Sequence, residues 1–135
     1  MKKFFWIFIV LIFVVVALAV ILFLIVNRVN MDFAKKAETC FVYDNINSKN
    51  LLNDKELKEL KTIFDGKIMY SDNPSCGFTE DISVKFNNNQ TFCIARDHCP
   101  IVYWKEKNKY IRLSENEKTK LYDLLSPYGF FFPCV

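Results

Sequence analysis

The sequence predicts an α+β protein in which an N-terminal transmembrane helix leads to a small antiparallel β-meander sheet packed against two helices. Three observations carry this prediction: one long apolar run, pairs of short strands joined by turn residues, and two amphipathic helices that each begin with a capping box. The expected parts of the chain are a cytoplasmic N-terminus at 1–3, a membrane helix at 4–26, a juxtamembrane stalk or linker at 27–50 and a small extracytoplasmic domain at 51–135.

The apolar run Phe4–Val26 contains 23 residues without a charge, a proline or a glycine. At about 1.5 Å per residue, a helix of this length is roughly 35 Å long, which is enough to cross a hydrocarbon core of about 30 Å. The sequence Ala-Leu-Ala at 17–19 resembles a signal-peptide cleavage site, but cutting there would leave a strongly apolar N-terminus. We therefore expect an uncleaved signal anchor that crosses the bilayer once.

The charges on the two sides of the run are nearly balanced, because Lys2 and Lys3 precede it while Arg28, Lys35 and Lys36 follow it. The short N-terminus is purely cationic, and the opposite orientation would carry it across the membrane. We therefore expect the N-terminus in the cytoplasm and the following domain outside it.

Beyond the run the domain is close to neutral, because the whole chain has 18 Lys and Arg against 15 Asp and Glu and two of the cations precede the run. No basic patch stands out, so we expect no nucleic-acid partner.

The segment that follows the run has apolar residues at Val29, Phe33, Ala37 and Phe41, which is close to a helical period. The membrane helix is therefore expected to continue as an amphipathic stalk. After Tyr43 the residues have turn-forming composition, and a flexible tether is an equal alternative there.

Two helices follow in the domain. The first begins at a capping box formed by Asn53 and Glu56 and ends at Gly66; the second begins at a box formed by Ser114 and Glu117. The second helix stops before Pro127. The side chains expected to face the sheet are Leu57, Leu60, Ile63 and Phe64 in the first helix and Leu121, Leu124 and Leu125 in the second.

Two hairpins, 81–86 with 91–96 and 101–104 with 110–113, are expected to form a four-stranded antiparallel sheet, and a further short strand is expected at 67–71. In the first hairpin a three-residue loop at 87–89 places Val84 opposite Phe92 and Ile82 opposite Ile94, so the apolar side chains share one face. In the second, a two-residue loop at Lys107 and Asn108 places Trp104 opposite Ile111 and Val102 opposite Leu113.

The stretch QTFCIARDHCP at 90–100 holds two cysteines, an aspartate and the only histidine of the chain. A zinc site would draw its ligands from Cys76, Cys93, His98, Cys99 and Cys134, but these spacings match no common zinc motif and contain no C-x-x-C. No glycine-rich segment lies nearby to form an oxyanion hole for a cysteine nucleophile. We therefore expect no catalytic residue, no metal ligand and no cofactor. A thiol- or metal-dependent protein that uses Cys93, His98 and Cys99 is the alternative.

The first hairpin also predicts a disulfide. Extending its register places Cys76 opposite Pro100, beside Cys99, at the open end of the hairpin, where the two cysteines meet at a separation that suits a bridge. Cys134 is expected to pair with Cys40 or Cys93, and side-chain parity does not say which. Five cysteines leave at least one unpaired.

Together these features predict a membrane-anchored binding or accessory domain that is not an enzyme. Its expected partners are the lipid bilayer and an envelope or membrane protein whose identity the sequence does not give.

Overall fold

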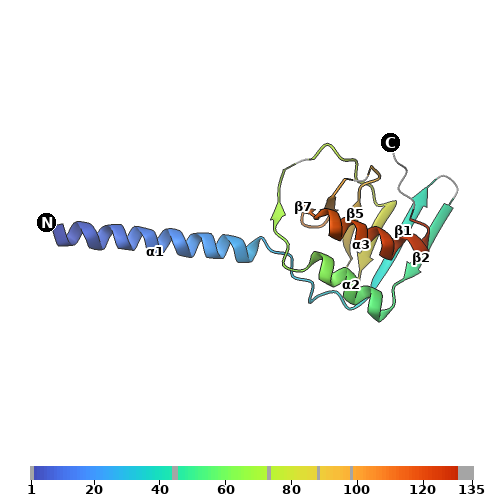
Figure 1. Ribbon diagram of the computed structural model, residues 1–135, viewed down its shortest axis with the longest axis horizontal. Helices are drawn as coiled ribbons and strands as arrows, with labels where there is room; N and C mark the ends of the chain where they lie inside the picture. Colours follow the sequence, from blue (N-terminus) through green and yellow to red (C-terminus); the bar gives the residue numbers. More distant parts are fainter. Residues whose placement is uncertain (1, 44–45, 73, 88, 98, 131–135) are drawn as a thin grey trace.

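The computed structural model describes residues 2–43, 46–72, 74–87, 89–97 and 99–130. A long helix, α1 (Lys2–Val26), projects from a domain in which two helices lie on one face of a seven-stranded antiparallel sheet (Figure 1). The strands are β1 (Ala37–Tyr43), β2 (Ile46–Leu51), β3 (Met69–Tyr70), β4 (Ile82–Phe86), β5 (Gln90–Ile94), β6 (Ile101–Trp104) and β7 (Lys109–Arg112). The two helices are α2 (Asp54–Phe64) and α3 (Glu115–Leu125), and a 3₁₀ turn, η1 (Ser126–Tyr128), follows α3. The α+β prediction is confirmed.

Helix α1 contains the apolar stretch Phe4–Val26, which is long and apolar enough to cross a membrane and of which no part is buried in the protein. A core helix of a soluble protein would be surrounded by other elements, whereas α1 stands apart from the domain (Figure 1). The chain therefore has one candidate membrane helix among its described residues.

The sheet has the order β2-β1-β4-β5-β6-β7-β3, so the expectation of four strands was wrong. Strands β1 and β2 form a hairpin in the segment 37–51, and β1 pairs along its other edge with β4. The expected stalk or tether is thus replaced by strands in this segment. Positions spaced by four residues fit the period of two of a strand as well as a helix, which is why the apolar pattern misled the prediction.

The stalk prediction also fails for the residues directly after α1. The amide of Val29 donates to the carbonyl of Lys67 at 2.8 Å, and the amide of Met69 donates to the carbonyl of Asn27 at 2.7 Å. Arg28 and Ile68 form an antiparallel bridge between these two bonds. The chain therefore enters the domain at the first residues after α1 and covers the outer edge of β3.

The first predicted hairpin register is confirmed. Val84 pairs with Phe92 and Ser83 with Cys93, as a three-residue loop requires. Asn89 in this loop has a φ of 56°, the left-handed conformation that asparagine tolerates better than most residues.

The second predicted register is wrong by two residues. Trp104 pairs with Lys109 and Val102 pairs with Ile111, because the loop contains four residues, 105–108, instead of two. The amide of Asn108 closes this loop on the carbonyl of Lys105, and Asn108 has a φ of 49°. A shift of two residues conserves side-chain parity, so the apolar residues still share one face.

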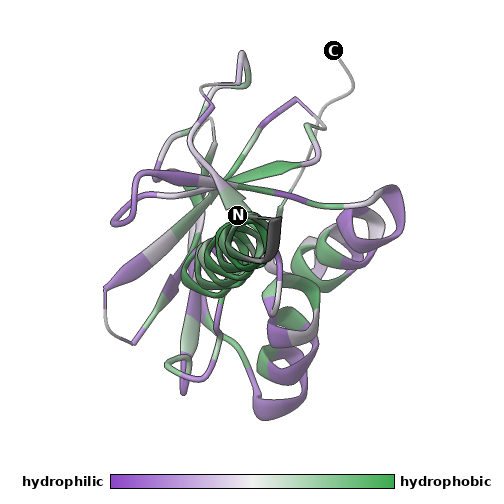
Figure 2. Ribbon diagram, turned by 90° about the vertical axis from the view of Figure 1, so that its left-hand side faces the viewer, coloured by the Kyte–Doolittle hydropathy of each residue, from purple (hydrophilic) through white to green (hydrophobic). Residues whose placement is uncertain are grey.

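Both capping boxes are present as predicted. Each helix turns its apolar residues toward the sheet and its polar residues outward (Figure 2). The centre of the core is Phe92, whose ring lies 4.9 Å from that of Phe64 on α2 and 4.8 Å from that of Trp104 on β6, measured between centroids. Packing of this kind favours a single arrangement of the helices on the sheet.

Candidate functional site

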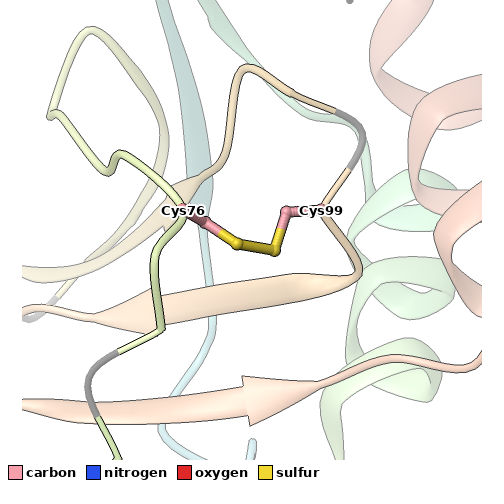
Figure 3. The surroundings of a disulfide bond; sticks show 2 residues. All are labelled: Cys76 and Cys99. Atoms are coloured by element: carbon pink, nitrogen blue, oxygen red, sulfur yellow. A yellow bond between two sulfur atoms is a disulfide. The ribbon is translucent and has the colours of Figure 1, made fainter.

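Cys76 and Cys99 form a disulfide with a Cα–Cα distance of 6.4 Å (Figure 3). The position expected for Cys76 on an extension of the first hairpin was wrong, because β4 begins only at Ile82. The bond instead joins the connection between β3 and β4 to the connection between β5 and β6. The connection from β3 must reach β4 past β5, β6 and β7, and we call its segment 74–81 the strap.

The strap lies on the face of the sheet opposite α2 and α3. The ring of Phe78 contacts those of Tyr103 and Tyr110, with centroids 5.8 and 5.7 Å away. The Glu80 carboxylate accepts hydrogen bonds from the ammonium groups of Lys85 and Lys105, which hold the pKa of Glu80 below its usual value. The strap thus covers part of this face, and the disulfide fixes one point of it.

Cys40 and Cys93 belong to a row of side chains that crosses the same face of the sheet. Cys40, Ser83, Cys93, Tyr103 and Tyr110 are register partners in five neighbouring strands. Strand β4 separates Cys40 from Cys93, so their Cα atoms are about 10 Å apart, which is too far for a disulfide between them. Both thiols are free within the described residues, and both are buried.

Cys93 is poorly suited to nucleophilic chemistry. Burial is the main cause that raises the pKa of its thiol to about 11, and the nearby carboxylates of Glu80 and Glu106 act in the same direction. The thiolate, which is the reactive form, is therefore scarce at neutral pH.

His98 lies outside the described residues, so the alternative cluster of Cys93, His98 and Cys99 is not tested as a whole; among the described residues Cys93 belongs to no group of potential metal ligands. Instead, the groups with metal-ligating atoms within 4.8 Å of one another are Cys76, Asp97 and Cys99. Two of these three ligands are joined in the disulfide, so only reduction would supply the thiolates that bind zinc. His98 and Cys134, including the predicted pairing of Cys134 with Cys40 or Cys93, lie outside the described residues.

A groove of about 570 Å³ between α2 and α3 is the second candidate site. Volumes of this size are typical of ligand pockets in proteins. Residues from both helices line the groove, namely Glu59, Thr62 and Ile63 from α2 and Glu117, Lys120, Asp123 and Leu124 from α3. Ile63 and Leu124 supply an apolar floor, and carboxylates dominate the walls.

The two ends of the groove are held by polar contacts between elements. At one end Lys67 Nζ lies 2.5 Å from Glu117 Oε1, and at the other the hydroxyl of Tyr128 donates to Glu56 Oε2 at 2.6 Å. Burial alone would raise the pKa of Glu117, but the ion pair with Lys67 and the hydrogen bonds from Ser114 outweigh it and lower this pKa. The hydrogen bond to Glu56 raises the pKa of Tyr128. The groove is therefore a feature fixed by the fold.

The groove was not predicted from the sequence, because the helical period of the apolar residues indicates only which face of each helix turns toward the sheet. A signal was present: Glu117, Lys120 and Asp123 are spaced by three residues, so they share one face of α3 beside the apolar stripe.

Comparisons with protein-family models, with curated proteins and with solved structures gave no match. A functional conclusion therefore depends on the arrangement of the residues in this chain.

Proposed function

We propose that the chain is a single-pass membrane protein whose extracytoplasmic domain binds an envelope or membrane protein and has no catalytic activity. The observation that carries the proposal is the groove between α2 and α3, in which an apolar floor lies between acidic walls. A complementary ligand is a polypeptide segment that places an apolar side chain on Ile63 and Leu124 and a neighbouring lysine or arginine near the carboxylates.

The position of the carboxylates supports this ligand class. Glu59 and Asp123 also line a smaller hollow that continues the groove toward Pro127. A cation between them would meet the charges of two exposed carboxylates, one of which, Glu59, lies 4.0 Å from the ammonium group of Lys55.

The proposed orientation places the N-terminus in the cytoplasm and α1 in the membrane as an uncleaved signal anchor. The disulfide between Cys76 and Cys99 supports a domain outside the cytoplasm, because such bonds persist in oxidising compartments.

Site-specific photo-crosslinking in native membranes tests the groove. A benzophenone amino acid at Lys120, inside the groove, should give a discrete crosslinked product with a partner protein, whereas the same group at Lys49 on β2 should not. The product should be lost in Glu59→Lys and Asp123→Lys variants, which reverse the charge of the walls. Asp72→Lys, which makes the same charge change outside the groove, should leave it intact. Equal products from positions 120 and 49, or insensitivity to the wall variants, would overturn the proposal.

The thiol- or metal-dependent alternative makes an opposite prediction. That alternative was based on Cys93, His98 and Cys99. At the group that the structure brings together instead, it would need Cys76 and Cys99 as free thiolates, with Asp97 as the neighbouring carboxylate. Elemental analysis and thiol counting on protein purified without reductant separate the two cases. Bound zinc, or reactive thiols at positions 76 and 99, would favour the alternative over the binding domain.

A further inference from the structure

The junction between α1 and the domain has no flexible linker. The backbone amide of Asn27 still donates to the carbonyl of Phe23 in the last turn of α1, at 3.1 Å. Val29, two residues later, is bonded on both sides: its amide to Lys67, and its carbonyl to the amide of Gly66 at 2.8 Å. These backbone hydrogen bonds on Asn27 and Val29 fix the direction in which the chain leaves α1. The domain therefore cannot swing freely about the end of the helix.

This junction fixes which end of the domain faces the membrane. Helix α1 meets the domain at β3, the last strand of the sheet, and the other strands follow one after another away from it (Figure 1). Six strand spacings of about 4.8 Å separate β3 from β2, so the far edge of the sheet lies roughly 29 Å from the near edge.

Ile68 lies at this near edge and is exposed. Outside α1, the large exposed hydrophobic residues of the described chain are Ile68, with 50% of its surface accessible, and Leu51, with 65%. Leu51 ends β2, at the opposite edge of the sheet. The two residues are therefore similar in chemistry and exposure but differ in distance from α1.

The depth of Ile68 relative to the bilayer follows from its backbone pairing with Arg28. Ile68 bridges Arg28, which is two residues beyond Val26, and two residues of extended chain span at most about 7 Å. The headgroup layer on each side of the hydrocarbon core is roughly 5 to 8 Å thick. If Val26 ends the apolar span, Ile68 lies within this layer.

We infer that the β3 end of the domain rests in the headgroup layer of the same bilayer that α1 crosses, with Ile68 as its apolar contact. This inference rests on the proposed function only in that α1 must span the membrane. The charged groups around the junction are mixed in sign: Arg28, Asp32 and Asp65 line one shallow hollow there. The contact therefore does not depend on anionic lipid.

Fluorescence quenching in nanodiscs tests the contact with the full-length chain. Ile68→Cys and Leu51→Cys are made in a Cys134→Ser background and labelled with bimane under native conditions, where the buried Cys40 and Cys93 are protected. The background protein without an added cysteine measures residual labelling. Nitroxides on the lipid headgroup should quench the label at position 68 several-fold more than the label at position 51.

A third label separates failure of this inference from failure of the membrane span. A bimane at Val14→Cys, near the middle of α1, should be quenched by a nitroxide deep in the acyl chain. Quenching at position 14 together with equal, weak quenching at 68 and 51 would overturn the docked domain while leaving the anchor intact. No quenching at position 14 would overturn both.

The lipid composition of the nanodiscs gives a further test. The difference in quenching between positions 68 and 51 should be the same in zwitterionic discs and in discs with anionic lipid. A contact that requires anionic lipid would overturn the assignment to Ile68.

Discussion

Cys93 shows how the environment of one side chain decides its chemistry. Because the pKa of the Cys93 thiol is about 11, about one thiol in a thousand is ionised at pH 8. The thiol is also buried, on the face of the sheet that the strap partly covers. We predict that iodoacetamide at pH 8 leaves Cys93 unmodified in the folded protein and alkylates it fully in guanidinium chloride, read by mass spectrometry of the peptide. Rapid alkylation of the native protein at this position would contradict the structure and favour a reactive thiol.

The disulfide holds the strap in place in the folded domain. It also stabilises the folded domain by restricting the conformations of the unfolded chain. Cys76 and Cys99 are 23 positions apart, and closing a loop of this size stabilises a domain by roughly 3 to 4 kcal/mol on the chain-entropy estimate. We predict that Cys76→Ser lowers the free energy of unfolding by about that amount in a denaturant titration.

The reductant response provides the control for this prediction. Dithiothreitol should destabilise the wild-type protein to the level of Cys76→Ser and should not destabilise the variant further, because the same bond is lost in both cases. Cys99→Ser should match Cys76→Ser. Unequal single variants, or a variant that still responds to reductant, would mean that another bond contributes.

Glu117 connects two elements, since it completes the capping box of α3 and pairs with Lys67 after α2. We predict that Glu117→Gln destabilises the domain by about 1 kcal/mol at pH 7. The pKa of Glu117 is lowered in the folded state, so its contribution is complete above its unfolded pKa and is lost as the pH falls through the folded value. The difference between wild type and variant should therefore shrink below about pH 4.5.

Urea unfolding at pH 7 and at successively lower pH measures this difference. Glu59→Gln is the matched control, because Glu59 is exposed and its contact with Lys55 is long, at 4.0 Å. Its effect should stay below about 0.5 kcal/mol at every pH. An effect of Glu117→Gln that does not vary with pH would contradict the ion pair as its cause.

The helices were predictable and the sheet only in part, for a physical reason. Capping boxes such as Asn53 with Glu56 are local: the residues that form the hydrogen bonds are three positions apart. The β4–β5 register is also local, because one short loop sets it. Pairing of β1 with β4 joins residues more than 40 positions apart, for example Phe41 with Ile82, and no turn signal reports such a contact.

The candidate site was less predictable than the fold. The groove needs both the spacing between two helices and the position of η1, and these depend on long-range packing such as the contact of Tyr128 with Glu56. The stretch 90–100 has residue types that are typical of a reactive or metal-binding site, but the sequence does not show that the Cys93 thiol is buried.

The extent of the folded unit is a property of the whole chain. Val29, Met31 and Ala34 belong to the same core cluster as Phe41 and Phe92. We predict that residues 27–135 fold as a domain without α1, whereas residues 44–135 do not, because the shorter fragment lacks β1 and with it the partner of β4. Circular dichroism and a cooperative thermal transition measure this. A cooperative transition in the shorter fragment would show that β1 is dispensable.

The orientation of the chain in the membrane depends on a small difference in charge. Lys2 and Lys3 precede the apolar stretch Phe4–Val26 of α1, while Arg28, Lys35 and Lys36 follow it, so the positive charges on the two sides are nearly equal. We predict that Lys2→Gln with Lys3→Gln increases the inverted fraction, read with a reporter fused after residue 135 that is active on one side only. Adding two lysines at the N-terminus is the matched control and should decrease that fraction. A parent protein whose reporter is wholly cytoplasmic would reverse the proposed orientation, and it would also place the Cys76–Cys99 bond in a reducing compartment, where such bonds are rare.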